Sequence, residues 1–100
     1  MPGARVSADT LIGDLVLINP NATIGHDVRI GNYTTLLPGS VISGHVSIGA
    51  RATVGAGAIV LPGLVVGGRS LIGAGAVVTK DVAEGDTVIG VPARPILSRA

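Results

Sequence analysis

Aliphatic side chains recur at every sixth position along most of this chain. From Val6 to Val78, each sixth residue is Val, Ile or Leu. The residue two places earlier is usually small or β-branched, and the residue that follows is often glycine. A period of six fits neither the turn of an α-helix nor the alternation of a hairpin array. It fits a short strand followed by a two-residue corner. Three such strand-and-corner units close one triangular coil.

The pattern therefore predicts an all-β fold, a parallel β-helix with a little over four triangular coils. Its aliphatic side chains are expected to point inward, and residues eighteen apart are expected to stack. One such predicted column contains Ile24, Ile42, Val60 and Val78. Outward-facing apolar residues, among them Leu37, Leu61 and Val65, indicate packing against other copies of the chain, so a homo-oligomer is expected.

The repeat divides the chain into an expected N-terminal arm (1–5), a β-helix domain (6–83) and a C-terminal cap or tail (84–100). The six-residue rule fails at Glu84. Val88 and Ile89 are expected to form a last strand, and the prolines that follow stop regular structure. This segment is expected to cover the open end of the coil, which would otherwise expose a sheet edge.

Composition agrees with short strands joined by tight corners. The 100 residues include 16 Gly, one aromatic residue (Tyr33) and no Cys. A net charge of +1 without a basic patch argues against a nucleic-acid partner, and the lack of Cys excludes thiolate metal sites. No secretory leader pattern opens the chain, and its longest apolar run, residues 56–66, is too short to span a bilayer. A cytoplasmic protein without membrane contact is expected.

The stretch IGHDVRIG, residues 24–31, places an ionisable pair, His26 and Asp27, at a corner of the repeat. Exposed corners tolerate polar residues, and an inert His is one reading. A His on a rigid edge with a carboxylate beside it is also suited to act as a general base. His45 is expected on the same edge, one coil further along.

Three segments, INPNATIGHDVRIG, PGSVISGHVSIG and GAGAVVTKDVAEGDTVIGVPAR, resemble the C-terminal domain of NeuD/PglD-type sugar acetyltransferases. The resemblance implies a left-handed β-helix of hexapeptide repeats and a homotrimer with sites between subunits. It also implies direct acetyl transfer from acetyl-CoA to a hydroxyl or amine of a sugar or sugar nucleotide, with no metal. Full-length members carry an N-terminal sugar-nucleotide domain. Because the repeat here begins near Met1, we expect a short form, an excised domain or a degenerate relative.

Carried over to this sequence, the resemblance assigns roles to individual residues. His26 matches the catalytic base, and Asp27 matches the acidic residue that raises its basicity. Gly44 matches a glycine whose backbone N–H approaches the thioester oxygen.

Other positions match the acetyl-CoA contacts of the family. Thr35 departs from the pattern, because it stands where relatives often have a second His near the acetyl group; its hydroxyl can still form a hydrogen bond to a carbonyl. Ala56 and Ala74 match contacts to the acetyl-CoA arm and are expected on a different edge from His26. Lys80 and Arg94 are candidates for binding the CoA phosphates.

Other function classes make different demands on the sequence. A non-catalytic β-helix scaffold explains the repeat and needs neither His nor CoA. A zinc hydratase of the γ-carbonic-anhydrase type needs three His ligands per metal, whereas the chain has two. The two GAGA runs imitate a dinucleotide-binding fingerprint, but no βαβ unit accompanies them, and that site is rejected.

Overall fold

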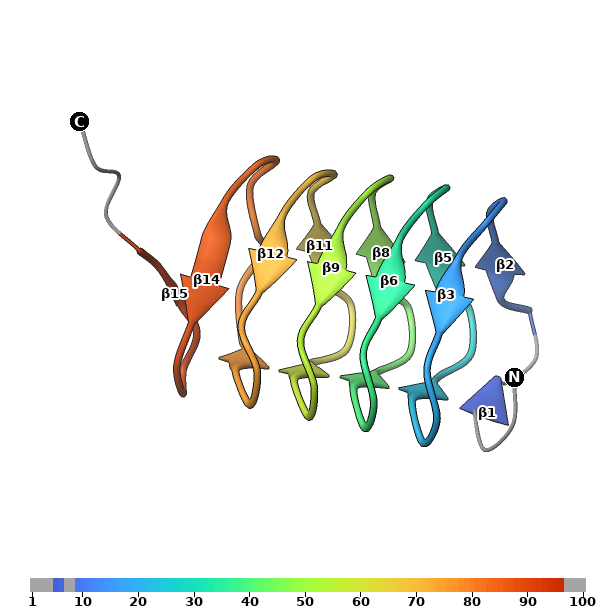
Figure 1. Ribbon diagram of the computed structural model, residues 1–100, viewed down its shortest axis with the longest axis horizontal. Coiled ribbons are helices and arrows are strands. Elements are labelled where there is room, and N and C mark those ends of the chain that lie inside the picture. The colour runs from blue at the N-terminus through green and yellow to red at the C-terminus, as the bar shows by residue number, and fades with distance from the viewer. Residues whose placement is uncertain (1–4, 7–8, 97–100) are drawn as a thin grey trace.

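The chain forms a three-sided parallel β-helix whose coils stack along one axis (Figure 1). A computed structural model describes residues 5–6 and 9–96. Within these residues every regular element is a short β-strand, as the six-residue period predicts. The same residues contain no helix of the length and apolar character needed to cross a membrane.

The strands are two residues long, except for β14, and as far as β13 they follow one another at the spacing of the repeat. They are β1 (Arg5–Val6), β2 (Leu11–Ile12), β3 (Leu17–Ile18), β4 (Thr23–Ile24), β5 (Arg29–Ile30), β6 (Thr35–Leu36), β7 (Val41–Ile42), β8 (Ser47–Ile48), β9 (Thr53–Val54), β10 (Ile59–Val60), β11 (Val65–Val66), β12 (Leu71–Ile72), β13 (Val77–Val78), β14 (Thr87–Ile89) and β15 (Arg94–Pro95).

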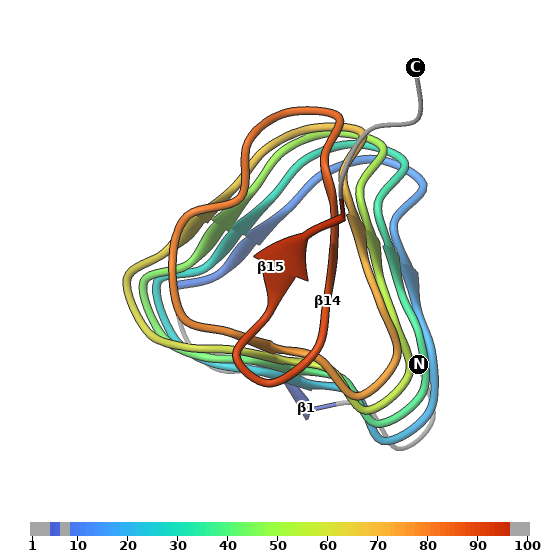
Figure 2. The same ribbon diagram turned by 90° about the vertical axis from the view of Figure 1, so that its left-hand side faces the viewer.

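These strands line the three faces of a triangular prism, which Figure 2 shows end-on. Face A contains β1, β4, β7, β10 and β13; face B contains β2, β5, β8 and β11; face C contains β3, β6, β9, β12, β14 and β15. Neighbouring strands pair in parallel, with Ile24 opposite Ile42 and Ile42 opposite Val60. Each of these coils therefore takes eighteen residues, and the predicted stacking is confirmed.

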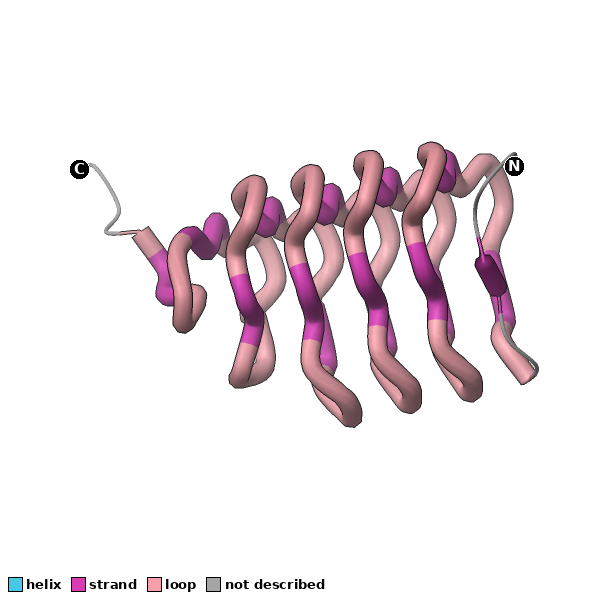
Figure 3. Tube along the Cα trace, turned by 90° about the horizontal axis from the view of Figure 1, so that it is seen from below, coloured by secondary structure: helices cyan, strands magenta, loops and turns pink. Residues whose placement is uncertain are grey.

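The core is a narrow column of aliphatic side chains inside the prism. From β4 to β13, the second residue of every strand is buried. Burial of one such side chain contributes about 1.5–3 kcal/mol. The small residues that precede each strand fill the corners from inside, for example Ala22, Ala58 and Ala76. Figure 3 shows the resulting alternation of strand and loop along every coil.

Close contact between successive coils explains why glycine follows many of the aliphatic residues. At Gly25, an added Cβ would lie 2.7 Å from the backbone nitrogen of Gly44 in the next coil. Real Cβ atoms do not approach backbone this closely, so a larger residue would force the two coils apart. Glycine here permits the close stacking of successive corners.

The C-terminal end of the β-helix departs from the six-residue period. Val82 bridges to Val66, and Val88 pairs with Ile72, so this last coil is two residues shorter than the others. Strand pairing thus continues past residue 83, and the expected strand at Val88 and Ile89 is present as part of β14. β15 pairs antiparallel with β14 and crosses the open end of the prism (Figure 2).

Candidate active site

One edge of the prism carries both histidines of the chain. It joins face A to face B at residues 25–27, 43–45 and 61–63, and we call it the histidine edge. His26 and Asp27 form a two-residue turn between β4 and β5. The flanking side chains of Ile24 and Val28 are fully buried and anchor this turn to the core.

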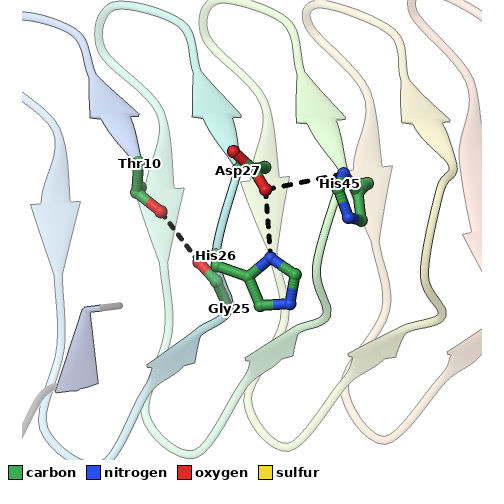
Figure 4. A network of polar contacts seen from close by, with 5 residues as sticks. All are labelled: Thr10, Gly25, His26, Asp27 and His45. Carbon is green, nitrogen blue, oxygen red and sulfur yellow. Dashed lines mark hydrogen bonds and ion pairs between the residues drawn. The ribbon is translucent and has the colours of Figure 1, made fainter. Parts of the chain in front are cut away.

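A hydrogen bond from the preceding coil also holds this corner. The Thr10 hydroxyl donates to the carbonyl oxygen of Gly25 at 2.8 Å (Figure 4). Gly25 directly precedes His26, so the backbone is fixed immediately before the imidazole. Core packing and this hydrogen bond together fix the backbone position of His26 before any ligand binds.

The His26 imidazole is oriented by the carboxylate of the next residue. Its Nδ1 lies 3.1 Å from Oδ2 of Asp27. An ionised carboxylate only accepts hydrogen bonds, so a neutral His26 donates its Nδ1–H to Asp27 and keeps a free lone pair on Nε2. The His26 side chain is 61% exposed, which leaves this ring accessible to a ligand.

Gly44, in the next coil, lies against the opposite side of the His26 ring. A Cβ built on Gly44 would be 3.3 Å from Nε2 of His26. Within the described residues, the Gly44 N–H donates no backbone hydrogen bond, whereas the next residue, His45, donates one to the His26 carbonyl at 3.0 Å. The structure therefore brings His26, Asp27 and a free backbone donor at Gly44 together in one place.

His45 belongs to the same cluster, although the resemblance assigns it no role. Its Nδ1 lies 3.8 Å from the same Asp27 Oδ2, and its ring packs edge-on against the His26 ring at 5.0 Å between centroids. Figure 4 shows both imidazoles directed toward one carboxylate. The signal for this contact was available in the sequence, because His45 follows Asp27 by one full coil of eighteen residues.

The other residues expected to contact acetyl-CoA lie elsewhere on the prism. Thr35 belongs to β6 on face C, which does not border the histidine edge. Ala56 and Ala74 are exposed at the edge between faces C and A, where the Gly75 N–H donates to the Ala56 carbonyl at 2.9 Å. We call this the alanine edge. The structure places the two alanines one above the other, but a single chain does not bring them or Thr35 to His26.

Lys80 and Arg94 line a common cavity at the C-terminal end of the prism. The cavity has a volume of about 230 Å³, and Asp81 and Asp86 also line it. Both basic residues therefore line a cavity that is also lined by carboxylates. This cavity lies at the C-terminal end of the prism, away from the coil that contains Gly44.

Comparison with known proteins identifies the repeat. The family model described as bacterial transferase hexapeptide (six repeats) matches residues 1–44. This repeat indicates the left-handed sense of the β-helix, in agreement with the expectation from the sequence. No curated protein sequence matches the chain.

Solved structures, acetyltransferases among them, match nearly the whole chain. A His-to-Ala mutant of GDP-perosamine N-acetyltransferase from Caulobacter crescentus, in complex with CoA and GDP-perosamine, is 29% identical with a TM-score of 0.74. WeeI from Acinetobacter baumannii is 32% identical with a TM-score of 0.74. Serine acetyltransferase from Neisseria gonorrhoeae is 29% identical with a TM-score of 0.89.

These matches cover most of this chain but only part of each relative. They extend over 96%, 91% and 95% of the chain, and over 54%, 57% and 41% of the Caulobacter, Acinetobacter and Neisseria proteins. The chain thus spans about half the length of these proteins. The resemblance to sugar acetyltransferases is confirmed, and the chain contains hexapeptide repeats in a left-handed β-helix similar to that of these proteins.

Proposed function

We propose that the chain transfers an acetyl group from acetyl-CoA to a hydroxyl or amine of a sugar or sugar nucleotide, with His26 as the general base. The observation that carries this proposal is the position of the His26 ring. Its Nδ1 lies 3.1 Å from the Asp27 carboxylate, and its Cε1–Nε2 edge lies beside Gly44. A base and a backbone donor side by side are what acyl transfer requires.

The reaction follows from the properties of these groups. Nε2 of His26 accepts the proton of the acceptor O–H or N–H as the acceptor oxygen or nitrogen attacks the thioester carbonyl. The Gly44 N–H donates to the oxyanion that forms on this carbonyl. When the C–S bond breaks, His26 returns the proton to the sulfur, and the products are the acetylated acceptor and CoA.

Asp27 acts through His26. While its carboxylate accepts the Nδ1–H, the tautomer with a free Nε2 is favoured. The carboxylate also stabilises the imidazolium that exists between the two proton transfers. Asp27 is therefore a positioning residue, and His26 is the group that exchanges protons with the substrates.

We propose that a second copy of the chain completes the acetyl-CoA site, within a homotrimer. Thr35, Ala56 and Ala74 lie on other parts of the prism, so they reach a His26 only across a subunit boundary. Exposed apolar side chains are available for such packing, among them Leu17 and Leu71 of face C and Val65 of face B. The small side chains of the alanine edge leave backbone amides open to the pantetheine arm.

The acceptor distinguishes the solved relatives from one another. The Caulobacter enzyme is described with GDP-perosamine, an amino-sugar nucleotide, and the Neisseria enzyme as a serine acetyltransferase. The sequence resemblance to the sugar enzymes favours a sugar acceptor here. Serine is therefore the comparison acceptor in the test.

The test measures CoA thiol release from acetyl-CoA in the presence of nucleotide-linked amino sugars, free amino sugars or serine, and identifies products by mass spectrometry. We expect a product that is 42 Da heavier, the mass of an acetyl group replacing hydrogen, with a sugar and no product with serine. A reaction without acceptor controls for thioester hydrolysis. Acetylation of serine alone would overturn the sugar assignment. Absence of transfer to every acceptor, together with no thermal stabilisation by acetyl-CoA, would favour the scaffold alternative.

A further inference from the structure

His45 has no part in the proposed transfer, yet its imidazole lies beside the same carboxylate as the catalytic base. Two imidazoles and one carboxylate share the histidine edge, and their ligand atoms all lie within 4.8 Å of one another. The family resemblance implied no metal, and two histidines are too few for a three-histidine zinc site. The structure adds Asp27 as a third donor and so makes a different ligand set available.

Two of the three distances between the ligand atoms are close to those of a divalent transition-metal site. Zinc binds imidazole nitrogen at about 2.0–2.1 Å and carboxylate oxygen at about 2.0–2.2 Å, so neighbouring ligand atoms in a tetrahedral site lie about 3.4 Å apart. The Asp27 Oδ2 lies 3.1 Å from Nδ1 of His26 and 3.8 Å from Nδ1 of His45. Changes of a few tenths of an ångström, within reach of side-chain rotation, bring both distances to this value.

The three ligands are held in place by the backbone and are open to solvent. The His45 N–H donates to the His26 carbonyl at 3.0 Å, which joins the two coils at this corner. The side chains of His26, Asp27 and His45 are 61%, 46% and 63% exposed. In the described part of the chain, Asp27 makes no ion pair with Lys or Arg. The carboxylate is therefore available to a cation, and three protein ligands leave a coordination position for water.

We propose that His26, Asp27 and His45 bind one zinc-type divalent ion per chain, and that the bound ion inhibits acetyl transfer. The second half of this proposal rests on the function proposed above; the first half does not. Zinc, nickel and copper suit a site of two imidazoles and one carboxylate better than magnesium or calcium, which prefer oxygen ligands.

Inhibition follows from the tautomer of His26. A metal on Nδ1 needs the lone pair of that nitrogen, so the single proton of the neutral imidazole moves to Nε2. With Nε2 protonated, His26 no longer accepts the proton of the attacking hydroxyl or amine. The carboxylate that oriented the ring is coordinated to the ion at the same time. No proton is gained or lost, and removal of the ion restores the active tautomer.

Metal binding is tested by titrating metal-free full-length protein with Zn²⁺ against a chromophoric chelator. We expect one ion per chain and an affinity at least about tenfold lower in His45→Asn, since even changes outside the ligand shell weaken metal sites by about 10–100-fold. Asn tolerates the left-handed backbone of residue 45, which has a φ of 62°. Arg51→Asn alters an equivalent corner with a φ of 63° on another edge and is the matched control.

The titration has a clear contrary result. If His45→Asn and the wild type bind Zn²⁺ equally, or if Arg51→Asn lowers the affinity as much as His45→Asn does, the cluster is not the binding site. Neither result depends on acetyl transfer, so failure of the metal site and failure of the proposed enzyme are distinguishable.

Inhibition is tested separately, once an acceptor is known. Zn²⁺ should stop acetyl transfer, and a chelator should restore it. For each protein, the measured quantity is the Zn²⁺ concentration that halves its own zinc-free rate. This concentration should be at least about tenfold higher in His45→Asn than in the wild type, because the variant has lost one metal ligand. Full activity of the wild type with one bound ion per chain would overturn the inhibitory role.

Discussion

Replacing His26 with Ala should lower kcat for acetyl transfer by about 10²–10⁴-fold, the usual contribution of a general base. The imidazole is the group placed to take the acceptor proton, with Asp27 at its Nδ1 and Gly44 beside its Cε1–Nε2 edge. KM for acetyl-CoA should change much less, because the proposed contacts to the CoA arm involve other residues. Steady-state kinetics with the acceptor that the transfer assay identifies checks both values.

The variant should fold normally, which makes the kinetic result interpretable. Alanine already occupies the equivalent corner position at Ala50, Ala56 and Ala74 of this chain. The thermal unfolding midpoint of His26→Ala should therefore stay close to that of the wild type. Full acetyl transfer by a well-folded His26→Ala protein would remove the proposed mechanism while leaving the fold untouched.

Replacing Ile42 with Ala should reduce the free energy of unfolding by about 2–5 kcal/mol, the range measured for such core truncations. Ile42 is 1% exposed and lies between Ile24 and Val60 in the column of face A. Each coil contributes only one inward-facing strand side chain from each of its three faces, so few neighbours can move to fill the cavity. Urea unfolding followed by circular dichroism measures the loss.

Leu11→Ala is the matched control for this core substitution. Leu11 also lies on a two-residue strand, but its side chain points outward and is 60% exposed. We expect it to cost at most about 1 kcal/mol, because most of its surface is in contact with water before and after the change. Equal losses in the two variants would contradict the assignment of inside and outside along the repeat.

The fold was predictable from the sequence because one period determines both strand and corner. A six-residue repeat fixes which side chains point inward, and Ile24, Ile42 and Val60 then have one way to stack. The shortened last coil was not predicted, because the six-residue period still holds at Val78. The inward-facing positions shift by two residues only after Val78. Val82 and Val88 are again six residues apart, but they are displaced by two residues from the earlier repeat.

The candidate site was predictable in part. The pairing of His26 with Asp27 follows from adjacency at a rigid corner, and the structure places them in contact. The sequence predicted that His45 lies on the same edge as His26. It did not lead to the prediction that the His45 ring lies close to the Asp27 carboxylate. The roles of Thr35, Ala56 and Ala74 stay predictions. They depend on how copies of the chain pack together, and that is not determined by a repeat within one chain.

A crystal structure with bound acetyl-CoA would show whether the histidine edge holds the acetyl-transfer centre. We expect the thioester oxygen to accept a hydrogen bond from the Gly44 N–H and the sulfur to lie beside His26 Nε2. We also expect the pantetheine arm to run along the alanine edge of a neighbouring copy. Acetyl-CoA bound to a single chain, with its thioester away from the histidine edge, would exclude an acetyl-transfer centre at this edge.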